Sequence, residues 1–423
     1  MTANTDINEI MLTVGARAQA AAAQLARASA DEKNAALRAA AERIEKNARH
    51  ICEINEDDVA AAGSAGKPAA FIDRMTLDKK GVEGICTALN AIADQDDPVG
   101  RVISSWTRPN GLEISRVATP IGVVAIIYES RPNVTVDAGA IAVKAGNAAI
   151  LRGGSECIAT NRILHQCLSD GLGDAGLPED AVQFVDTSDR AAVGALLSGL
   201  DGAVDLVIPR GGKSLVARVQ DEARVAVLSH LDGICHVYLD RDADIEKAVA
   251  IALNAKMRRP GVCGAAETLL IDRAALAALA PPVLGALREA GCEIRGDEAV
   301  AAVASVDKPA TVEDWDTEYL DAVISVAAVD GVDGAIAHIA AHASGHTDAI
   351  VTENVETAEH FLASVSSAIV LHNASTQYAD GGEFGLGAEI GIATGKLHAR
   401  GPVGAAELTT YKNVVRGDGQ VRP

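Results

Sequence analysis

Short apolar runs alternate with helical patterns from Pro120 onward, and this alternation most constrains how the chain can fold. The run at 121–128 is apolar throughout, as strands are when a parallel sheet is buried on both faces. Further strands are expected at 148–151, 181–185 and 204–208, with helices at 134–144 and 155–172 between them. This order of elements is typical of a doubly wound α/β sheet.

A second α/β unit is expected after the turn at 230–233. Its strands are predicted at 235–239, 268–271, 322–326, 349–352 and 368–372, and its helices at 244–256, 274–290, 332–343 and from Val355 onward. The 423 residues exceed the roughly 250–300 at which a single hydrophobic core stops growing, so two such units fit the length.

Helices and a hairpin are expected before the first sheet. Ser29 and Glu32 have the spacing of a capping box, and apolar residues then recur every three or four positions as far as Ile51. The turn at 106–111 precedes an extended run at 112–117, which predicts a polar β-hairpin. Such a hairpin either pairs with a neighbouring subunit or packs on its own domain, and the sequence alone leaves both open.

The charge balance excludes some classes of partner. The chain has 58 acidic against 37 basic residues, a net charge of −21, which argues against a broad nucleic-acid or anionic-membrane surface. No stretch reaches the roughly 18 uninterrupted apolar residues of a membrane span, and the N-terminus lacks a cleavable apolar segment. The seven cysteines are scattered without a Cys-x-x-Cys pair, which fits reduced thiols better than disulfides or a zinc site. A cytoplasmic protein that binds neither nucleic acid nor membrane is expected.

Cationic loops are expected at the carboxyl ends of the first sheet's strands, where ligands of such folds bind. Two of the loops contain glycine pairs, which let backbone amides approach a ligand, and helix N-termini favour anions. Together the loops predict a dinucleotide site, although each alone is more often a plain turn and no Gly-x-Gly-x-x-Gly or Walker loop is present. The candidate cofactor-binding residues are Arg152, Gly153, Gly154, Ser155, Pro209, Arg210, Gly211 and Gly212.

Cys263 is the candidate nucleophile. It follows Arg258, Arg259 and a Pro-Gly turn, between a helical pattern and a strand-like run, so it is expected on a connecting loop. Nearby guanidinium groups favour the thiolate, which is the nucleophilic form of cysteine. Cysteine is also commonly buried as a small inert hydrophobe, and the local sequence leaves that alternative open.

Three elements of the sequence together carry a resemblance to a known family. They are Tyr-Glu-Ser-Arg-Pro-Asn-Val-Thr at 128–135, Arg-Arg-Pro-Gly-Val-Cys at 258–263, and Phe-Gly-Leu-Gly-Ala-Glu at 384–389 with Leu-His-Ala-Arg-Gly-Pro at 397–402. From the N-terminal helices to about Tyr411, the chain resembles the γ-glutamyl phosphate reductases of the aldehyde dehydrogenase superfamily. The resemblance implies that NADPH reduces L-glutamate 5-phosphate to glutamate 5-semialdehyde with release of phosphate, the second step of proline biosynthesis.

The resemblance also implies roles for particular residues. Cys263 matches the family's nucleophile, which would form a thioester, and Asn133 matches the asparagine that helps to bind the oxyanion. The cations that are candidates for binding the substrate are Arg258, Arg259, His398 and Arg400. Each of these is equally suited to a surface ion pair.

The family's architecture implies an aldehyde-dehydrogenase-like fold in three parts. These are a dinucleotide-binding domain at 1–106 and 119–228, a catalytic domain at 229–395, and an oligomerisation arm at 107–118 with the C-terminal segment 396–423. A homo-oligomer is the expected assembly, and glutamate 5-kinase, which makes the unstable substrate, is a candidate partner. The sequence places no charged residue beside the ribose 2′ position, so NADPH rather than NADH rests on the resemblance.

One stretch departs from the wider superfamily. Residues 230–234 read His-Leu-Asp-Gly-Ile, where hydrolytic aldehyde dehydrogenases have Glu-Leu-Gly-Gly-Lys. That glutamate activates water against the thioester, so its absence fits a reductase. His230 and Asp232 are candidate substitutes, which leaves a hydrolytic dehydrogenase as an alternative, beside an aldehyde dehydrogenase that transfers the acyl group to coenzyme A.

Three histidines recur at four-residue spacing, at positions 338, 342 and 346. This spacing can place imidazoles on one helical face and bind zinc. Ser344 and Gly345 are expected to end the helix before the third histidine, and no metal is predicted.

Overall fold

A computed structural model describes residues 7–422 and divides the chain into two compact units. Unit 1 contains the residues up to Ser229, Gly385–Gly391 and the segment from Val403. Unit 2 contains His230–Phe384 and Ile392–Pro402. Within the described range, no helix is both long and apolar enough to cross a membrane.

The units differ from the predicted domain boundaries near the C-terminus. Residues 396–402 lie in unit 2 rather than with the arm, because β15 (Ile392–Ala393) pairs with β16 (Gly401–Pro402) and Arg400 Nη2 donates to the Ser366 carbonyl oxygen at 2.8 Å. Residues 385–391 belong to unit 1, where Gln95 Nε2 donates to the Leu386 carbonyl oxygen at 2.6 Å. The chain therefore passes between the units more often than predicted.

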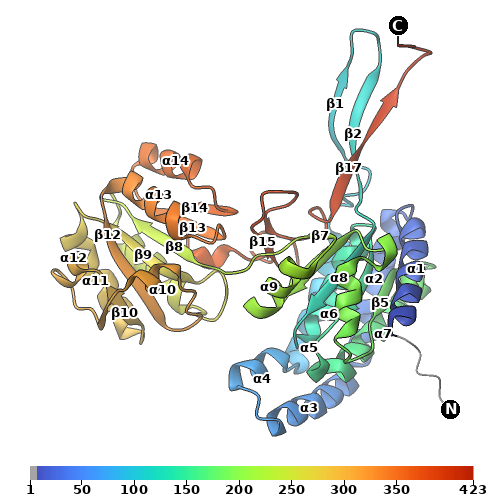
Figure 1. Ribbon diagram of the computed structural model, residues 1–423, viewed down its shortest axis with the longest axis horizontal. Coiled ribbons are helices and arrows are strands. Elements are labelled where there is room, and N and C mark those ends of the chain that lie inside the picture. Colours follow the sequence, from blue (N-terminus) through green and yellow to red (C-terminus); the bar gives the residue numbers. More distant parts are fainter. Residues whose placement is uncertain (1–6, 423) are drawn as a thin grey trace. The chain divides into compact units, whose positions relative to one another are not determined.

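A five-stranded parallel sheet of order β5-β4-β3-β6-β7 lies at the centre of unit 1 (Figure 1). Its strands are β3 (Val123–Tyr128), β4 (Ala148–Arg152), β5 (Val182–Phe184), β6 (Leu206–Arg210) and β7 (Ala226–Val227). Every residue of β3 is buried, as the uninterrupted apolar run predicted. The strand order places the carboxyl ends of β4, β3 and β6 side by side, so the predicted cationic loops share one edge of the sheet.

Nine α-helices of unit 1 are described. They are α1 (Ile7–Leu25), α2 (Ala30–Lys46), α3 (Ala48–Ser64), α4 (Ala69–Met75), α5 (Lys79–Asp94), α6 (Pro132–Lys144), α7 (Ile158–Asp174), α8 (Ala191–Ser198) and α9 (Lys213–Glu222). The predicted capping box is confirmed at the start of α2, where the Glu32 backbone N–H donates to Ser29 Oγ at 3.3 Å and the Ser29 N–H to Glu32 Oε2 at 2.7 Å.

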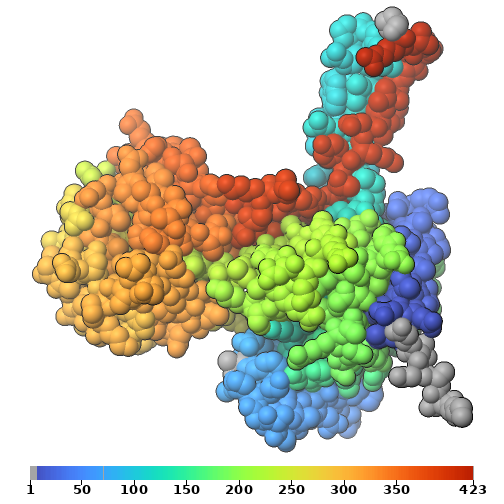
Figure 2. Space-filling view, viewed as in Figure 1, coloured from blue at the N-terminus to red at the C-terminus, as the bar shows by residue number. Residues whose placement is uncertain are grey.

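A three-stranded antiparallel sheet, also in unit 1, contains the predicted hairpin. β1 (Val102–Thr107) pairs with β2 (Glu113–Pro120), and the C-terminal strand β17 (Thr409–Arg416) pairs with the other side of β2. Figure 2 shows β17 lying along the hairpin over most of its length. All six residues of β1 are exposed, and the outer edges of β1 and β17 pair with no described strand.

Unit 2 is built on a seven-stranded parallel sheet of order β11-β10-β12-β9-β8-β13-β14. Its strands are β8 (Cys235–Leu239), β9 (Ala266–Asp272), β10 (Glu293–Gly296), β11 (Lys308–Pro309), β12 (Val323–Val329), β13 (Thr347–Val351) and β14 (Ile369–His372). Its helices are α10 (Ile245–Met257), α11 (Leu276–Glu289), α12 (Glu298–Ala301), α13 (Gly331–His342) and α14 (Val355–Ser364). The predicted strands are confirmed, whereas β10 and β11 were missed because they are short and carry charged residues.

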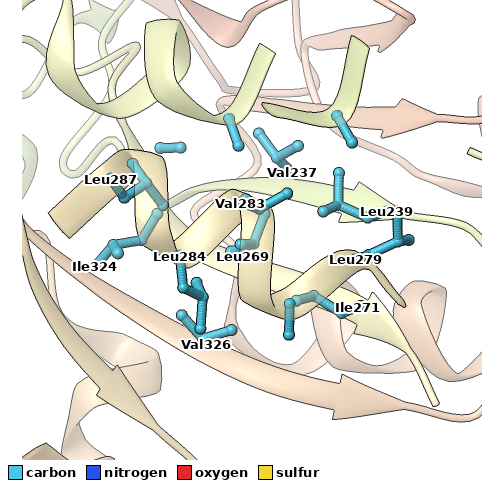
Figure 3. Packing of buried hydrophobic residues seen from close by; sticks show 14 of the residues in the cluster. Val237, Leu239, Leu269, Ile271, Leu279, Val283, Leu284, Leu287, Ile324 and Val326 are labelled. Carbon is cyan, nitrogen blue, oxygen red and sulfur yellow. The ribbon is translucent and has the colours of Figure 1, made fainter. Parts of the chain in front are cut away.

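The core on one face of this sheet is aliphatic. Figure 3 shows side chains of α11 packed against those of β8, β9 and β12, including Val237, Leu239, Leu269, Ile271, Val283, Leu284, Leu287, Ile324 and Val326. Each of these side chains is at most 3 % exposed. Burying a Val, Leu or Ile side chain stabilises the fold by about 1.5–3 kcal/mol, so this core holds the sheet rigid beneath the loops that carry the site.

Candidate active site

Cys263 lies in the loop between α10 and β9, as predicted. One neighbour of β9 in the sheet is β8, and the other neighbour of β8 is β13. His230 lies before β8, and His346 immediately precedes β13. The three side chains therefore come together at the amino ends of three adjacent parallel strands, although they are far apart in the sequence.

The Cys263 thiol faces both histidines. Its sulfur and one ring nitrogen of each histidine lie within 4.8 Å of one another. The rings of His230 and His346 meet edge to face, with centroids 5.1 Å apart. His230 Nδ1 lies 2.6 Å from the Ile392 carbonyl oxygen, so this nitrogen is the donor.

The backbone of Cys263 packs tightly on the segment that enters β8. A Cβ atom at Gly233 would lie 2.1 Å from the Cys263 carbonyl oxygen and 2.6 Å from its Cα, so a side chain does not fit there. The Cys235 thiol donates to the same carbonyl oxygen at 3.1 Å. These contacts fix the peptide that carries the thiol.

The pKa of Cys263 distinguishes it from the other cysteines. Burial raises its pKa, but His346 and His230 outweigh burial and bring the pKa well below the ordinary value of 9.0. In the six other cysteines burial raises the pKa, to about 12 in Cys157. The thiolate is therefore favoured at Cys263 alone.

The predicted cause of this activation was wrong. Arg258 and Arg259 are exposed at the start of the loop, and neither is among the main causes of the lowered pKa of Cys263. The two histidines act instead. From the sequence, His230 is expected only as a candidate water-activating base, and His346 only as one of three spaced histidines.

Glu318 is a further residue of this site that the sequence did not indicate. One carboxylate oxygen of Glu318 accepts a hydrogen bond from the Gly233 backbone N–H at 2.8 Å. Its pKa is raised by burial and by the nearby charges of Asp232 and Cys263. Glu318 precedes β12, another strand of the same sheet, so only the strand order could have indicated it.

The other predicted substrate-binding residues, His398 and Arg400, lie in the segment that precedes β16. His398 is exposed and has a positive φ of 64°. Arg400 is half-buried, and its Nε atom is buried without a hydrogen-bond partner in the described part of the chain. A buried guanidinium nitrogen of this kind is suited to an anionic ligand.

Asn133 lies in unit 1, exposed in the first turn of α6. Its Nδ2 donates to Asp137 Oδ2 at 2.9 Å, one helical turn further on. Burial raises the pKa of Asp137 to about 6, opposed by the hydrogen bond from Asn133 and by the charge of Arg210. The contact orients the amide and uses one of its two N–H groups, so the other can donate elsewhere.

Part of the predicted cofactor site lines a cavity of about 290 Å³ in unit 1. Arg152, Gly154 and Ser155 line it, together with Arg190 and Arg218, which the sequence did not single out. Burial lowers the pKa of Arg152, and the charges of Arg190 and Arg218 lower it further, against the opposite effect of Glu156. The Arg152 Nε atom is buried and has no hydrogen-bond partner among the described residues. Glu129 and Glu156 line the cavity as well, so the three arginines share it with two carboxylates.

The remaining predicted cofactor residues, Gly153, Pro209, Arg210, Gly211 and Gly212, do not line this cavity. The last four lie at the end of β6, where Arg210 Nη2 lies 3.6 Å from Glu389 Oε1. Neighbouring side chains also explain why glycine stands at Gly153 and Gly211, because a larger residue would clash with them. A Cβ atom at Gly153 would lie 2.3 Å from Asn161 Nδ2, and one at Gly211 would lie 2.6 Å from Glu129 Cγ.

The three spaced histidines do not form one cluster. His338 and His342 lie on α13 with ring centroids 4.6 Å apart, and α13 ends at His342, as the sequence predicted. His346 instead joins His230 and Cys263. In the described residues, that group is the one set of side chains with the spacing of metal ligands.

Comparison with known proteins identifies relatives along the whole chain. The model of the aldehyde dehydrogenase family matches residues 7–316. A γ-glutamyl phosphate reductase of Brucella suis is 58% identical over 417 residues, covering 99% of each chain. One of Rhizorhabdus wittichii is 60% identical over 420 residues, covering 99% of this chain and 97% of that protein.

Solved structures are similar to this chain over nearly its whole length. The crystal structure of a γ-glutamyl phosphate reductase from Thermotoga maritima has a TM-score of 0.94 and 42% identity, covering 98% of this chain and 100% of that chain. An acetylating aldehyde dehydrogenase from Geobacillus thermoglucosidasius has a TM-score of 0.69 at 17% identity, covering 99% of this chain and 100% of that chain. The latter similarity concerns the fold alone.

Gly233→Ala tests the contact that positions Cys263. The added methyl group displaces the Cys263 peptide, and we expect a fall in kcat/KM of about 100-fold, as for a displacement of about 1 Å in an active site. Gly261→Ala is the matched control, because the nearest atom to its added Cβ is the Leu320 carbonyl oxygen at 3.8 Å. Equal activities of the two variants in a steady-state assay would contradict the assigned role of Gly233.

Proposed function

The chain belongs to the aldehyde dehydrogenase family, and from this we propose that it reduces L-glutamate 5-phosphate to L-glutamate 5-semialdehyde with release of phosphate, in proline biosynthesis. The full-length relatives at 58% and 60% identity are named for this reaction. The observation in the structure that carries the proposal is the Cys263 thiol. It lies at the amino end of β9 in unit 2, and its pKa is lowered well below 9.0. The reaction needs such a nucleophile.

In the proposed mechanism, the Cys263 thiolate attacks the acyl carbon of the substrate. A carbon–sulfur bond forms and the carbon–oxygen bond to phosphate breaks, so phosphate departs with the bonding electrons and a thioester remains. NADPH, when held by unit 1, would supply the hydride for reduction of this thioester. The Cys263 sulfur is then expelled as a thiolate when the aldehyde forms.

Asn133 is proposed to stabilise the oxyanion during these steps. Its amide is oriented by the hydrogen bond to Asp137 and keeps one N–H for donation. One such donor is worth about 2.7–4 kcal/mol of transition-state stabilisation in other enzymes. Arg258, Arg259, His398 and Arg400 are proposed to bind the anionic groups of the substrate.

The family implies a nicotinamide cofactor, and we propose that it is NADPH and that unit 1 binds it. The cavity beside the end of β4 contains Arg152, Arg190 and Arg218. The charges of Arg190 and Arg218 lower the pKa of Arg152, against the opposite effect of Glu156, and the 2′-phosphate of NADPH would add negative charge beside these arginines. NADH, with a hydroxyl group there, offers no such charge.

The three-stranded sheet is proposed to join subunits into a homo-oligomer. Exposed strand edges readily pair with another chain, and β1 and β17 each present such an edge. Large apolar side chains on the same strands are exposed as well, including Val102, Ile103, Trp106, Tyr411 and Val415. Contact with a second subunit would remove these apolar side chains from water.

The reverse reaction tests the proposed function. We expect glutamate 5-semialdehyde to reduce NADP⁺ only when inorganic phosphate is present, because phosphate must release the acyl group from Cys263. The measurement is the absorbance of the reduced nicotinamide, with and without phosphate and with coenzyme A as a third arm. Turnover without phosphate would mean that water attacks the thioester, with His230 as the candidate base beside the thiol, and turnover with coenzyme A alone would indicate the acylating alternative.

Arg190→Ala tests the preference for NADPH. Loss of a charged hydrogen bond costs about 1.5–3 kcal/mol, so we expect the KM for NADPH to rise about 10- to 100-fold while the KM for NADH stays unchanged. Arg49→Ala is the control, because Arg49 is exposed on α3 and pairs with Glu53. An equal loss for both cofactors would place Arg190 outside the 2′-phosphate site.

A further inference from the structure

His346 is held in one orientation by two neighbours. Its Nδ1 lies 2.9 Å from Thr347 Oγ1 and 3.6 Å from Cys235 Sγ, and the side chain is fully buried. Its Nε2 is buried and has no hydrogen-bond partner among the residues described. Because Nδ1 is engaged by these neighbours, Nε2 is the ring nitrogen left to interact with the thiol of Cys263.

Cys235 fixes which nitrogen of His346 carries the hydrogen. The single hydrogen of the Cys235 thiol is donated to the Cys263 carbonyl oxygen at 3.1 Å, and a carbonyl oxygen can only accept. The Cys235 sulfur is therefore left as an acceptor toward His346 Nδ1, and the Thr347 hydroxyl can accept there as well, so both neighbours favour a hydrogen on Nδ1 and a lone pair on Nε2. Burial raises the pKa of Cys235 well above 9.0, so Cys235 retains its proton and this arrangement persists.

We propose that His346 accepts the thiol proton of Cys263 through Nε2, and that Cys235 is the positioning residue that sets the His346 tautomer. This rests on the proposed function for its chemistry and adds two residues to it. The proton passes from sulfur to Nε2, which gives a thiolate and an imidazolium. After the carbon–sulfur bond forms, the imidazolium returns the proton to the departing phosphate. The thiolate released with the aldehyde is protonated from solvent, so one proton is consumed in each turnover.

His230 is assigned a lesser part. Its Nδ1–H is donated to the Ile392 carbonyl oxygen, which leaves its Nε2 as an acceptor too, but the side chain is only partly buried whereas His346 is fully buried. Charges interact more strongly where water is excluded, so His346 is the better partner for the thiolate. The other titratable groups near Cys263 are Glu318, which precedes β12, and Cys235 on β8.

The test measures how fast iodoacetamide alkylates Cys263 as a function of pH, with no substrate present and the modified peptide identified by mass spectrometry. Because the pKa of Cys263 is lowered, the reactive thiolate is present above that pKa and is lost as the pH falls through it. His346→Gln removes the acceptor, and we expect the rate at about pH 7 to fall at least about tenfold, which corresponds to about one pKa unit. His230→Gln should change it by less than about threefold.

Cys235 provides an independent pair of variants. Cys235→Ala removes both contacts, and we expect a fall of about threefold or more at pH 7. Cys235→Ser keeps a donor for the carbonyl oxygen and an acceptor for Nδ1, so its pH profile should match the wild type. If His346→Gln fails to fold, judged by circular dichroism, this pair decides the outcome.

Three results would overturn the inference: an unchanged pH profile in His346→Gln, a larger effect in His230→Gln, or no difference between Cys235→Ala and Cys235→Ser. Because no substrate or cofactor is used, these results are independent of the reaction proposed above. A protein without phosphate-dependent activity but with the expected alkylation profiles would refute the proposed function and leave the proton relay standing.

Discussion

The packing of the Cys263 peptide against the start of β8 is the contact on which the site of unit 2 depends. Gly233 leaves room for that peptide, and the Cys235 thiol donates to its carbonyl oxygen. The sulfur is thereby held where His230 and His346 reach it from the neighbouring strand ends. A thiol in a buried site would otherwise have a raised pKa, as the six other cysteines of the chain do.

The two sheets present their functional side chains at opposite ends of their strands. In unit 1 the arginine-lined cavity lies beside the carboxyl end of β4, as is usual for doubly wound sheets. In unit 2 the thiol and its histidines lie at the amino ends of β9, β8 and β13. The two sites also differ in their side chains, because the first gathers three arginines around a cavity and the second places two histidines beside one sulfur.

The sequence was sufficient for most of the fold and for the single residue Cys263, but not for its surroundings. The apolar runs predicted the central strands because period and burial are local properties, whereas β10 and β11 lack an apolar run. His346 could not be assigned to Cys263, because their proximity follows from the order of β13, β8 and β9 across the sheet. Two arginines of the unit 1 cavity were missed for the same reason, since Arg190 and Arg218 are near Arg152 only in the folded chain.

Covalent capture of the acyl group tests the central claim most directly. The protein would be mixed with glutamate 5-semialdehyde and NADP⁺ without phosphate, quenched in acid, digested and examined by mass spectrometry. The account predicts a mass increase of one γ-glutamyl group on the peptide that contains Cys263, absent in Cys263→Ser and discharged when phosphate is added before the quench. An unmodified Cys263 peptide under conditions of single turnover, or a γ-glutamyl group on another cysteine, would contradict it.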